Sequence, residues 1–141
     1  MSAERPDPGV VYVNGRFEPG DRASISVFDH GFLYGDGVFD TSFARHGWIF
    51  KLDEHLDRLE RSLKAVALDL PVSMAELRDA TIETVARNGR KDAYIKIVAS
   101  RGVSAEPLMD PRSCEPTVVI FARPYLSLAG ASVKARGLVT K

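Results

Sequence analysis

Residues 28–43, FDHGFLYGDGVFDTSF, combine aromatic rings, carboxylates and glycines in a proportion that suits neither a plain core strand nor a disordered linker. Apolar rings with a few polar groups are the usual lining of a small-molecule pocket. Glycines permit the close backbone turns that such a lining needs. The stretch is therefore a candidate for one side of a binding cavity, although strand aromatics ordinarily serve as core.

Two predicted strands place polar groups beside aromatic or apolar side chains. Because side chains alternate along a strand, each strand gathers one set on a single face: Phe39, Thr41 and Phe43 on the first, and Tyr94 and Lys96 on the second. A hydroxyl, a phenol and an amine among rings would together form one wall. Such a wall suits a small polar molecule with an apolar part.

A third candidate is a cation on a helix. Apolar residues at helical spacing over residues 52–70 leave His55 and Arg58 on the same flank, one turn apart. A cation held there could meet an anion over the sheet. By spacing alone Arg58 is a solvated surface arginine, because helix flanks normally carry charge, and His55 is a packing or capping residue.

The elements that must position these residues begin with turns. Asn14-Gly15 between two apolar arms predicts a hairpin over residues 10–18. SISVFDHG, residues 24–31, predicts a short strand or extended segment, and the glycines after it indicate a loop. His46-Gly47 then turns the strand that starts at Val38 into WIFKL.

Two helices follow. Asp53 is a good N-cap for the first, and Pro71 ends it. Ser73 and Glu76 have the spacing of a capping box, and Asn88-Gly89 is a plausible C-terminal stop for the second.

Strands close the chain. Residues 92–100 alternate as a strand, residues 101–116 carry three prolines and predict a loop, and TVVIFA after them predicts a strand buried on both faces. The element order predicts an α+β fold, a two-layer, mostly antiparallel sheet with two main helices on one face. We expect residues 1–123 to form this domain and residues 124–141 to form a connector and the start of another unit.

Composition limits the partners. Nineteen basic residues balance nineteen acidic ones, so no overall field attracts nucleic acid or an anionic membrane. No apolar run reaches the ~18 residues of a membrane span, and we expect a soluble, cytoplasmic protein. The single cysteine, Cys114, excludes an internal disulfide and is expected to be a semi-exposed loop thiol.

Common chemical motifs are missing. GFLYGDG lacks the order of a dinucleotide-binding loop, no phosphate-binding Gly-Lys-Ser/Thr loop is present, and no nucleophile elbow appears. The three histidines lack metal-site spacing, so we expect no metal site. From residue types alone, the chain is a pocket-bearing domain.

Two longer segments resemble a known family. ISVFDHGFLYGDGVFDTSF and IFKLDEHLDRLERSLKAVAL, joined through His46-Gly47, are similar to the N-terminal domain of the class IV aminotransferases, the fold type IV pyridoxal-phosphate enzymes. The family includes branched-chain and D-amino acid aminotransferases, (R)-selective amine transaminases and aminodeoxychorismate lyases. The resemblance runs from about Val11 to about Pro124.

The resemblance implies residue roles. Arg58 corresponds to the family arginine that binds the phosphate of pyridoxal 5'-phosphate, while His55 stays structural. The residues that fall on pocket-lining positions are Tyr34, Phe39, Thr41, Phe43, Tyr94 and Lys96. Residues 28–43 would then form one side of the cofactor and substrate cavity.

The resemblance also implies a missing amine. The family's Schiff-base lysine is expected roughly twenty residues beyond Lys141, in a C-terminal domain, so this sequence is expected to be a fragment with no catalytic residue of its own. Such a fragment is expected not to retain the cofactor. Because family members are generally homodimers, we also expect dimerisation or self-association.

Substrate class stays open at this point. Branched-chain enzymes usually show Phe-Glu-Gly-x-Arg where this chain has Phe39-Asp40-Thr41-Ser42-Phe43, which weakens a branched-chain assignment and leaves a D-amino acid or amine transaminase open. Lys96 resembles the lyase branch, and its amine could hold a substrate carboxylate. Transamination with a small-molecule amino donor and keto acid is preferred; a lyase and a non-catalytic binding or assembly module are the alternatives.

Overall fold

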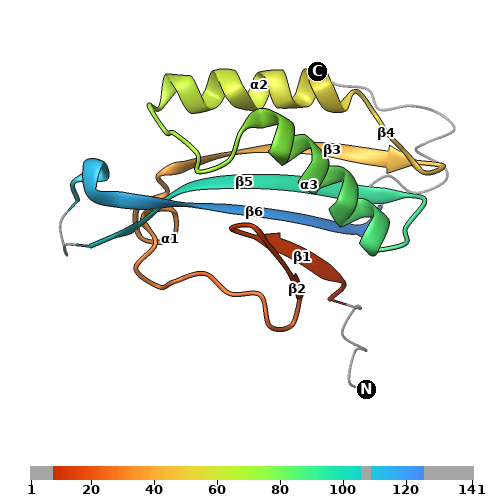
Figure 1. The fold of residues 1–141 in the computed structure, drawn as a ribbon, viewed down its shortest axis with the longest axis horizontal. Coiled ribbons are helices and arrows are strands. Elements are labelled where there is room, and N and C mark those ends of the chain that lie inside the picture. The colour runs from red at the N-terminus through yellow and green to blue at the C-terminus, as the bar shows by residue number, and fades with distance from the viewer. Residues whose placement is uncertain (1–7, 106–108, 126–141) are drawn as a thin grey trace, which may run out of the picture.

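The structure is a computed structural model that describes residues 8–105 and 109–125. One six-stranded sheet has the order β2-β1-β6-β5-β3-β4, and every neighbouring pair is antiparallel (Figure 1). The elements are β1 (Val10–Val13), β2 (Arg16–Pro19), α1 (His30–Tyr34), β3 (Gly37–Arg45), β4 (Trp48–Ile49), α2 (Leu52–Ala65), α3 (Met74–Arg87), β5 (Ala93–Ser104), the 3₁₀ turn η1 (Pro111–Ser113) and β6 (Cys114–Pro124).

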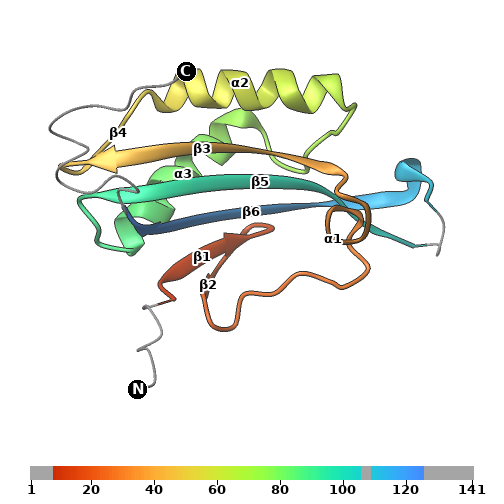
Figure 2. The same ribbon diagram turned by 180° about the vertical axis from the view of Figure 1, so that it is seen from behind.

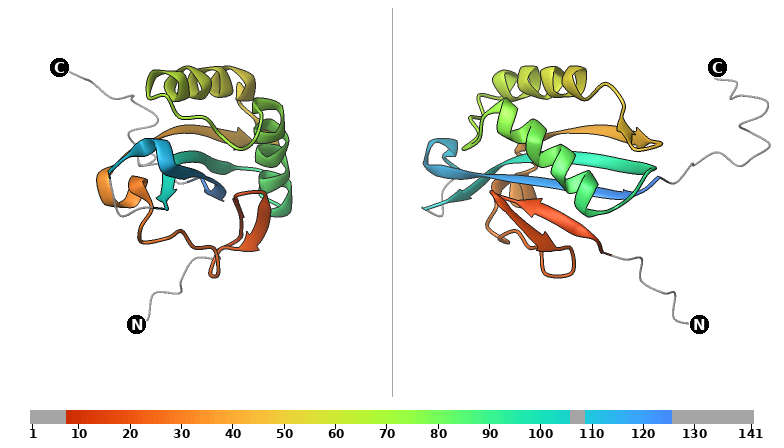
Figure 3. Two further views of the ribbon diagram at one scale, coloured as in Figure 1. Left: turned by 60° about the vertical axis from the view of Figure 1, so that its left-hand side comes forward. Right: turned by 45° about the vertical axis from the view of Figure 1, so that its right-hand side comes forward.

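The sheet has a covered face and an open face. Helices α2 and α3 lie together on the covered face, and among the described elements only the short α1 lies on the other side, at one end (Figures 2 and 3). The core between helices and sheet is built from leucines of α2 and α3 and alternating residues of the central strands, among them Leu56, Leu59, Leu77, Ile97, Val118 and Ile120. The predicted α+β class is confirmed.

The two predicted turns are present. Asn14 and Gly15 have φ angles of 45° and 88°, and they join β1 to β2. His46 and Gly47 have φ angles of 53° and 85°, and they join β3 to β4. Positive φ at both central residues matches the right-handed twist of the flanking strands, which is why these dipeptides serve in tight hairpins.

The second helix begins and ends as predicted, but the first does not. Ser73 and Glu76 form the capping box of α3, and Asn88 is its C-cap. Helix α2 instead begins after Lys51, so Asp53 lies inside the first turn and accepts a hydrogen bond from Nε of Arg78 at 2.8 Å. The prediction of Asp53 as N-cap was therefore wrong.

Helix α2 also ends earlier than Pro71. Its last residue is Ala65, and the carbonyls of Val66 and Ala67 accept hydrogen bonds of 2.7 Å from the guanidinium of Arg101. Arg101 also donates hydrogen bonds to the Asp36 carboxylate through Nε and Nη2. A side chain thirty-four residues further on in the chain thus satisfies the helix end, which local spacing does not reveal.

Three further expectations needed correction. The extended segment near residue 28 gives way to α1, because the side chain of Asp29 accepts from the amide of Gly31 and caps a helical turn. Strand β5 continues through a bulge between Ser100 and Val103, so the predicted loop 101–116 is shorter. Strand β6 is buried on one face only, since Val119 and Phe121 are half-buried on the open face.

No helix in the described ranges is long and apolar enough to cross a membrane. Strand β6 extends to Pro124, one residue past the predicted domain boundary between residues 123 and 124. The predicted connector beyond residue 125, including Lys141, lies outside the described residues, and the division stays a prediction.

Candidate functional site

The open face of the sheet brings together most of the predicted pocket residues. Thr41 on β3 pairs with Lys96 on β5, and Phe43 pairs with Tyr94. Because side chains alternate, these four point to the face away from α2 and α3. The Nζ of Lys96 lies 4.0 Å from the centroid of the Phe39 ring, a cation–π contact on an aromatic side chain that is 62% exposed.

Aromatic rings extend this surface on both sides. The ring of Phe43 stacks on that of Phe50 at 5.1 Å, and Tyr125 tilts against Phe43 at 6.1 Å. Across β5, Phe121 pairs with Lys96. Phe50, Phe121 and Tyr125 were not predicted as members of this face. The period-two alternation of TVVIFA could have indicated Phe121, whereas nothing local indicates that Phe50 or Tyr125 meets Phe43.

Tyr34 lies apart from this cluster. It belongs to α1, is 49% exposed, and packs edge-on against His30 with the ring centroids 4.9 Å apart. Among the described residues no ring contact joins Tyr34 to Phe39 or Phe43. Its placement in the pocket therefore stays a prediction.

Arg58 is held by a buried carboxylate. Its Nε and Nη2 donate to Oδ2 and Oδ1 of Asp40 at 2.7 and 3.0 Å. The Nδ1 of His55 lies 2.6 Å from Oδ1 of the same carboxylate. The Asp40 side chain is only 3% exposed, whereas that of Arg58 is 58% exposed. Helix α2 thus supplies two partners to one carboxylate of β3.

The charges of this cluster follow from the contacts. Burial alone would raise the pKa of Asp40, but the hydrogen bonds from Arg58 and His55 outweigh it, so the pKa lies below its usual value. The hydrogen bond to Asp40 in turn raises the pKa of Arg58. Since an ionised carboxylate can only accept, the Nδ1 of His55 is the donor in its contact with Asp40.

Arg58 and the aromatic wall lie on opposite faces of β3, but they share an edge of the sheet. Strand β4 pairs only with Ala44 and Arg45, so among the described strands residues 37–43 have β5 on one side and no strand on the other. Helix α2 runs along this edge (Figure 1). A ligand at the edge could therefore contact Arg58 from one side and the Phe39 face from the other.

The guanidinium suits an anion at this edge. In the described part of the chain, Nη1 of Arg58 has no hydrogen-bond partner, and the group remains charged and largely exposed. A planar fork held on one side by a carboxylate still presents paired donors on the other, which matches the oxygen spacing of phosphate or carboxylate. The residues present therefore fit a phosphate group.

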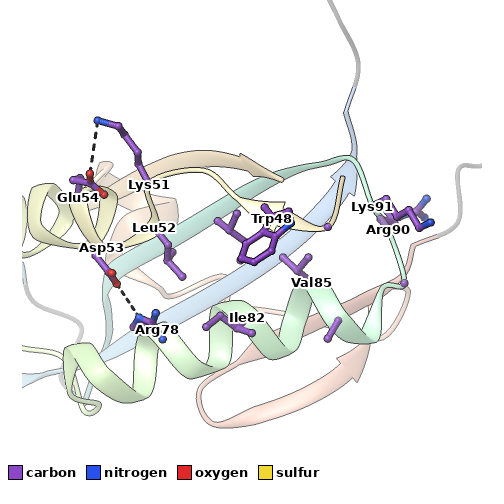
Figure 4. A pocket seen from close by; sticks show the side chains of 14 residues that line it. Trp48, Lys51, Leu52, Asp53, Glu54, Arg78, Ile82, Val85, Arg90 and Lys91 are labelled. Carbon is purple, nitrogen blue, oxygen red and sulfur yellow. Dashed lines mark hydrogen bonds and ion pairs between the residues drawn. The ribbon is translucent and has the colours of Figure 1, made fainter. Parts of the chain in front are cut away.

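A groove in the described part of the chain lies away from this edge. It has a volume of about 640 Å³ between β4, the start of α2 and α3, with Trp48, Ile82 and Val85 among its lining (Figure 4). The Asp53–Arg78 and Lys51–Glu54 ion pairs border it. None of the predicted site residues lines it. Within the described ranges, no cluster of three metal-ligating side chains occurs.

Comparisons with known proteins agree with this architecture. The sequence profile of the family Amino-transferase class IV matches residues 37–140. A putative branched-chain-amino-acid aminotransferase of Methanocaldococcus jannaschii is 46% identical over 121 residues, which cover 85% of this chain and 42% of that protein. An aminodeoxychorismate lyase of Bacillus subtilis is 39% identical over 79% of this chain and 39% of its own length. A D-alanine aminotransferase of Staphylococcus haemolyticus is 33% identical, with 82% and 41% covered.

Solved structures give the same answer. The branched-chain aminotransferase of Thermoproteus uzoniensis with norvaline matches with a TM-score of 0.74 and 35% identity over 83% of this chain and 41% of that one. The branched-chain amino acid aminotransferase of T.th. with pyridoxamine 5'-phosphate matches with a TM-score of 0.77 and 30% identity, covering 91% and 43%. The chain thus spans about two fifths of the length of the relatives it matches. It belongs to the class IV aminotransferase family.

Proposed function

We propose that this domain forms one wall of the active site of a pyridoxal-phosphate-dependent aminotransferase that moves an amino group between an amino acid or amine and a 2-keto acid. The observation that carries the proposal is the shared edge of β3. On one side Arg58 is charged, exposed and fixed by Asp40, and on the other Lys96 lies against the aromatic ring of Phe39.

Arg58 is the residue of this chain that would hold the cofactor phosphate. The fit rests on Nη1, which has no hydrogen-bond partner among the described residues, and on the charge that Asp40 maintains. One of the similar enzymes was solved with pyridoxamine 5'-phosphate. Bound here, pyridoxal 5'-phosphate would supply the aldehyde and the electron-accepting ring that transamination needs.

The open face would bind and orient the substrate. The ammonium of Lys96 would hold a substrate carboxylate, and the rings of Phe39 and Phe43 would exclude water from the apolar part. The Thr41 hydroxyl, directly across from Lys96, would accept or donate one further hydrogen bond. Tyr34 and Tyr94 complete the proposed lining.

The lysine on which the chemistry depends is proposed to come from the remaining three fifths of the relatives' length, which has no counterpart in these residues. We also propose that the working enzyme is a homodimer. In the described residues no element covers the side chains of the proposed wall. A second domain or subunit would therefore be required to close the cavity.

A lyase is the second candidate. Lys96 on the open face favours it, and the Bacillus subtilis lyase is 39% identical to this chain. Both candidates would use the same cofactor phosphate anchor, so their substrates and products separate them.

The test is an assay of the full-length protein with pyridoxal 5'-phosphate. Branched-chain L-amino acids, D-alanine and a chiral amine are offered as donors with 2-oxoglutarate or pyruvate as acceptor, and aminodeoxychorismate is offered alone. Stoichiometric keto product from one donor supports the aminotransferase. Pyruvate and an aromatic amine from aminodeoxychorismate alone would support the lyase, and no turnover of any of these compounds would contradict both.

A further inference from the structure

The partner of the phosphate anchor is itself placed to act on ligand binding. Asp40 projects from β3 to the helix side, where it is almost fully buried and meets both His55 and Arg58. We propose that Asp40 is a positioning residue: it fixes the guanidinium of Arg58 by its Nε and Nη2 edge so that Nη1 faces the phosphate. This inference rests on the proposed function.

The geometry of the cluster restricts the arginine strongly. Two parallel hydrogen bonds to one carboxylate determine both the position and the plane of a guanidinium. Oδ1 of that carboxylate is also bonded to His55 at 2.6 Å, which opposes rotation of the Asp40 side chain. Asp40 lies between Phe39 and Thr41 in β3. It therefore fixes the position of Arg58 relative to the proposed substrate wall.

Two opposing effects decide whether Asp40 tightens or weakens phosphate binding. Ordering one long side chain on binding weakens affinity by about 2- to 10-fold, and Asp40 removes that cost before the ligand arrives. Its negative charge also repels a phosphate across the guanidinium. Solvent on the phosphate side, where the Arg58 side chain is 58% exposed, screens part of that repulsion. The ordering effect therefore prevails, and Asp40 should tighten phosphate binding.

The test measures equilibrium binding of pyridoxal 5'-phosphate and of pyridoxal, which lacks the phosphate, to the full-length protein by dialysis. Asp40→Asn keeps the side-chain size and removes the charge. We expect it to weaken pyridoxal phosphate about 3- to 10-fold and to leave pyridoxal unchanged. Arg58→Gln should weaken pyridoxal phosphate more, and adding Asp40→Asn to it should cause no further loss. Asp57→Asn, on an exposed carboxylate of the same helix, is the matched control and should change neither affinity.

The outcomes separate the two claims. A phosphate-specific loss in Arg58→Gln with none, or a gain, in Asp40→Asn would overturn the positioning role and leave the proposed function intact. Equal loss of both ligands in Asp40→Asn would assign Asp40 a purely structural role and also overturn it. If Arg58→Gln binds both ligands normally, the phosphate anchor of the proposed function fails.

Should Asp40→Asn not fold, Asp40→Glu provides the same measurement. It keeps the charge but extends the carboxylate by one methylene, which displaces the guanidinium. A positioning role predicts a changed ratio of the two affinities in this variant, and an unchanged ratio would overturn it.

Discussion

At the scale of single residues, Asp40 shows how a buried charge is maintained. Removing a carboxylate from water is costly, and here the hydrogen bonds of Arg58 and His55 outweigh that cost, because both donors come from the facing side of α2. The pair therefore contributes to stability as well as to the proposed site. That contribution depends on pH in a direction set by the lowered pKa.

A group with a lowered pKa in the folded state stabilises the fold above its unfolded pKa. For Asp40 that reference is 3.8, so its contribution should be complete near pH 7 and should disappear as the pH falls through the lower, folded-state value. Asp40→Asn should lower the free energy of unfolding by about 1–3 kcal/mol at pH 7. Urea unfolding at about pH 7 and about pH 2.5 measures it. An equal deficit at both pH values would show that the charge is not involved.

Lys96 carries the prediction on substrate binding. Lys96→Met keeps the length and apolar stem but removes the ammonium, so a keto acid should lose a charge-assisted partner. Its KM should rise about 10-fold or more, with unchanged affinity for pyridoxal phosphate. Lys91→Met, on an exposed lysine outside the open face, is the control. Steady-state kinetics of the full-length protein measure the KM for the keto acid. An unaltered KM would exclude Lys96 as the carboxylate partner.

At the scale of elements, two glycines of nearly equal φ serve different purposes. Gly15 has φ 88° and no heavy atom within 4 Å of the position that a Cβ would occupy, whereas Gly102 has φ 83° and a Cβ there would overlap the carbonyl of Glu115. Gly102 occupies the bulge that lets β5 continue to Ser104 beside β6. Both positions require a positive φ, but only at Gly102 would a side chain also clash with a neighbouring strand.

Substituting these two glycines distinguishes the cost of backbone strain at Gly15 from the cost of a steric clash at Gly102. Gly15→Ala should cost about 1–2 kcal/mol, the usual penalty of a side chain in the left-handed region. Gly102→Ala should cost at least about 2 kcal/mol more, because the backbone of β6 must move. The free energies of unfolding of both variants measure this difference. Equal losses would mean that the bulge yields easily.

The same elements show what the sequence can predict. The alternation of residues 38–44 and 93–99, the two hairpin turns and the capping box at Ser73 follow local rules, and each was predicted correctly. The end of α2 depends on Arg101 and the continuation of β5 depends on a contact with β6, so both lie beyond local rules. Strand alternation puts Asp40 on the face opposite Phe39 and Thr41, but its bonds to α2 span fifteen and eighteen positions and were not foreseen.

At the scale of the whole molecule, helices α2 and α3 cover only one face of the sheet. The helices bury the covered face, while Phe39 and Phe50 on the other side remain 62% and 49% exposed. Exposed aromatic surface of this kind marks a binding site or an interface. Together with a span of about two fifths of the relatives' length, it agrees with the proposal that this domain supplies one wall of a cavity closed by other parts of the enzyme.

The most direct test of that proposal is a crystal structure of the full-length protein with pyridoxal 5'-phosphate and a 2-keto acid. We predict a phosphate oxygen within hydrogen-bond distance, about 2.7–3.2 Å, of the guanidinium of Arg58. We also predict the keto acid over the open face, its carboxylate beside Lys96. A phosphate bound away from Arg58, or a substrate that avoids the face of Phe39 and Lys96, would contradict the proposal.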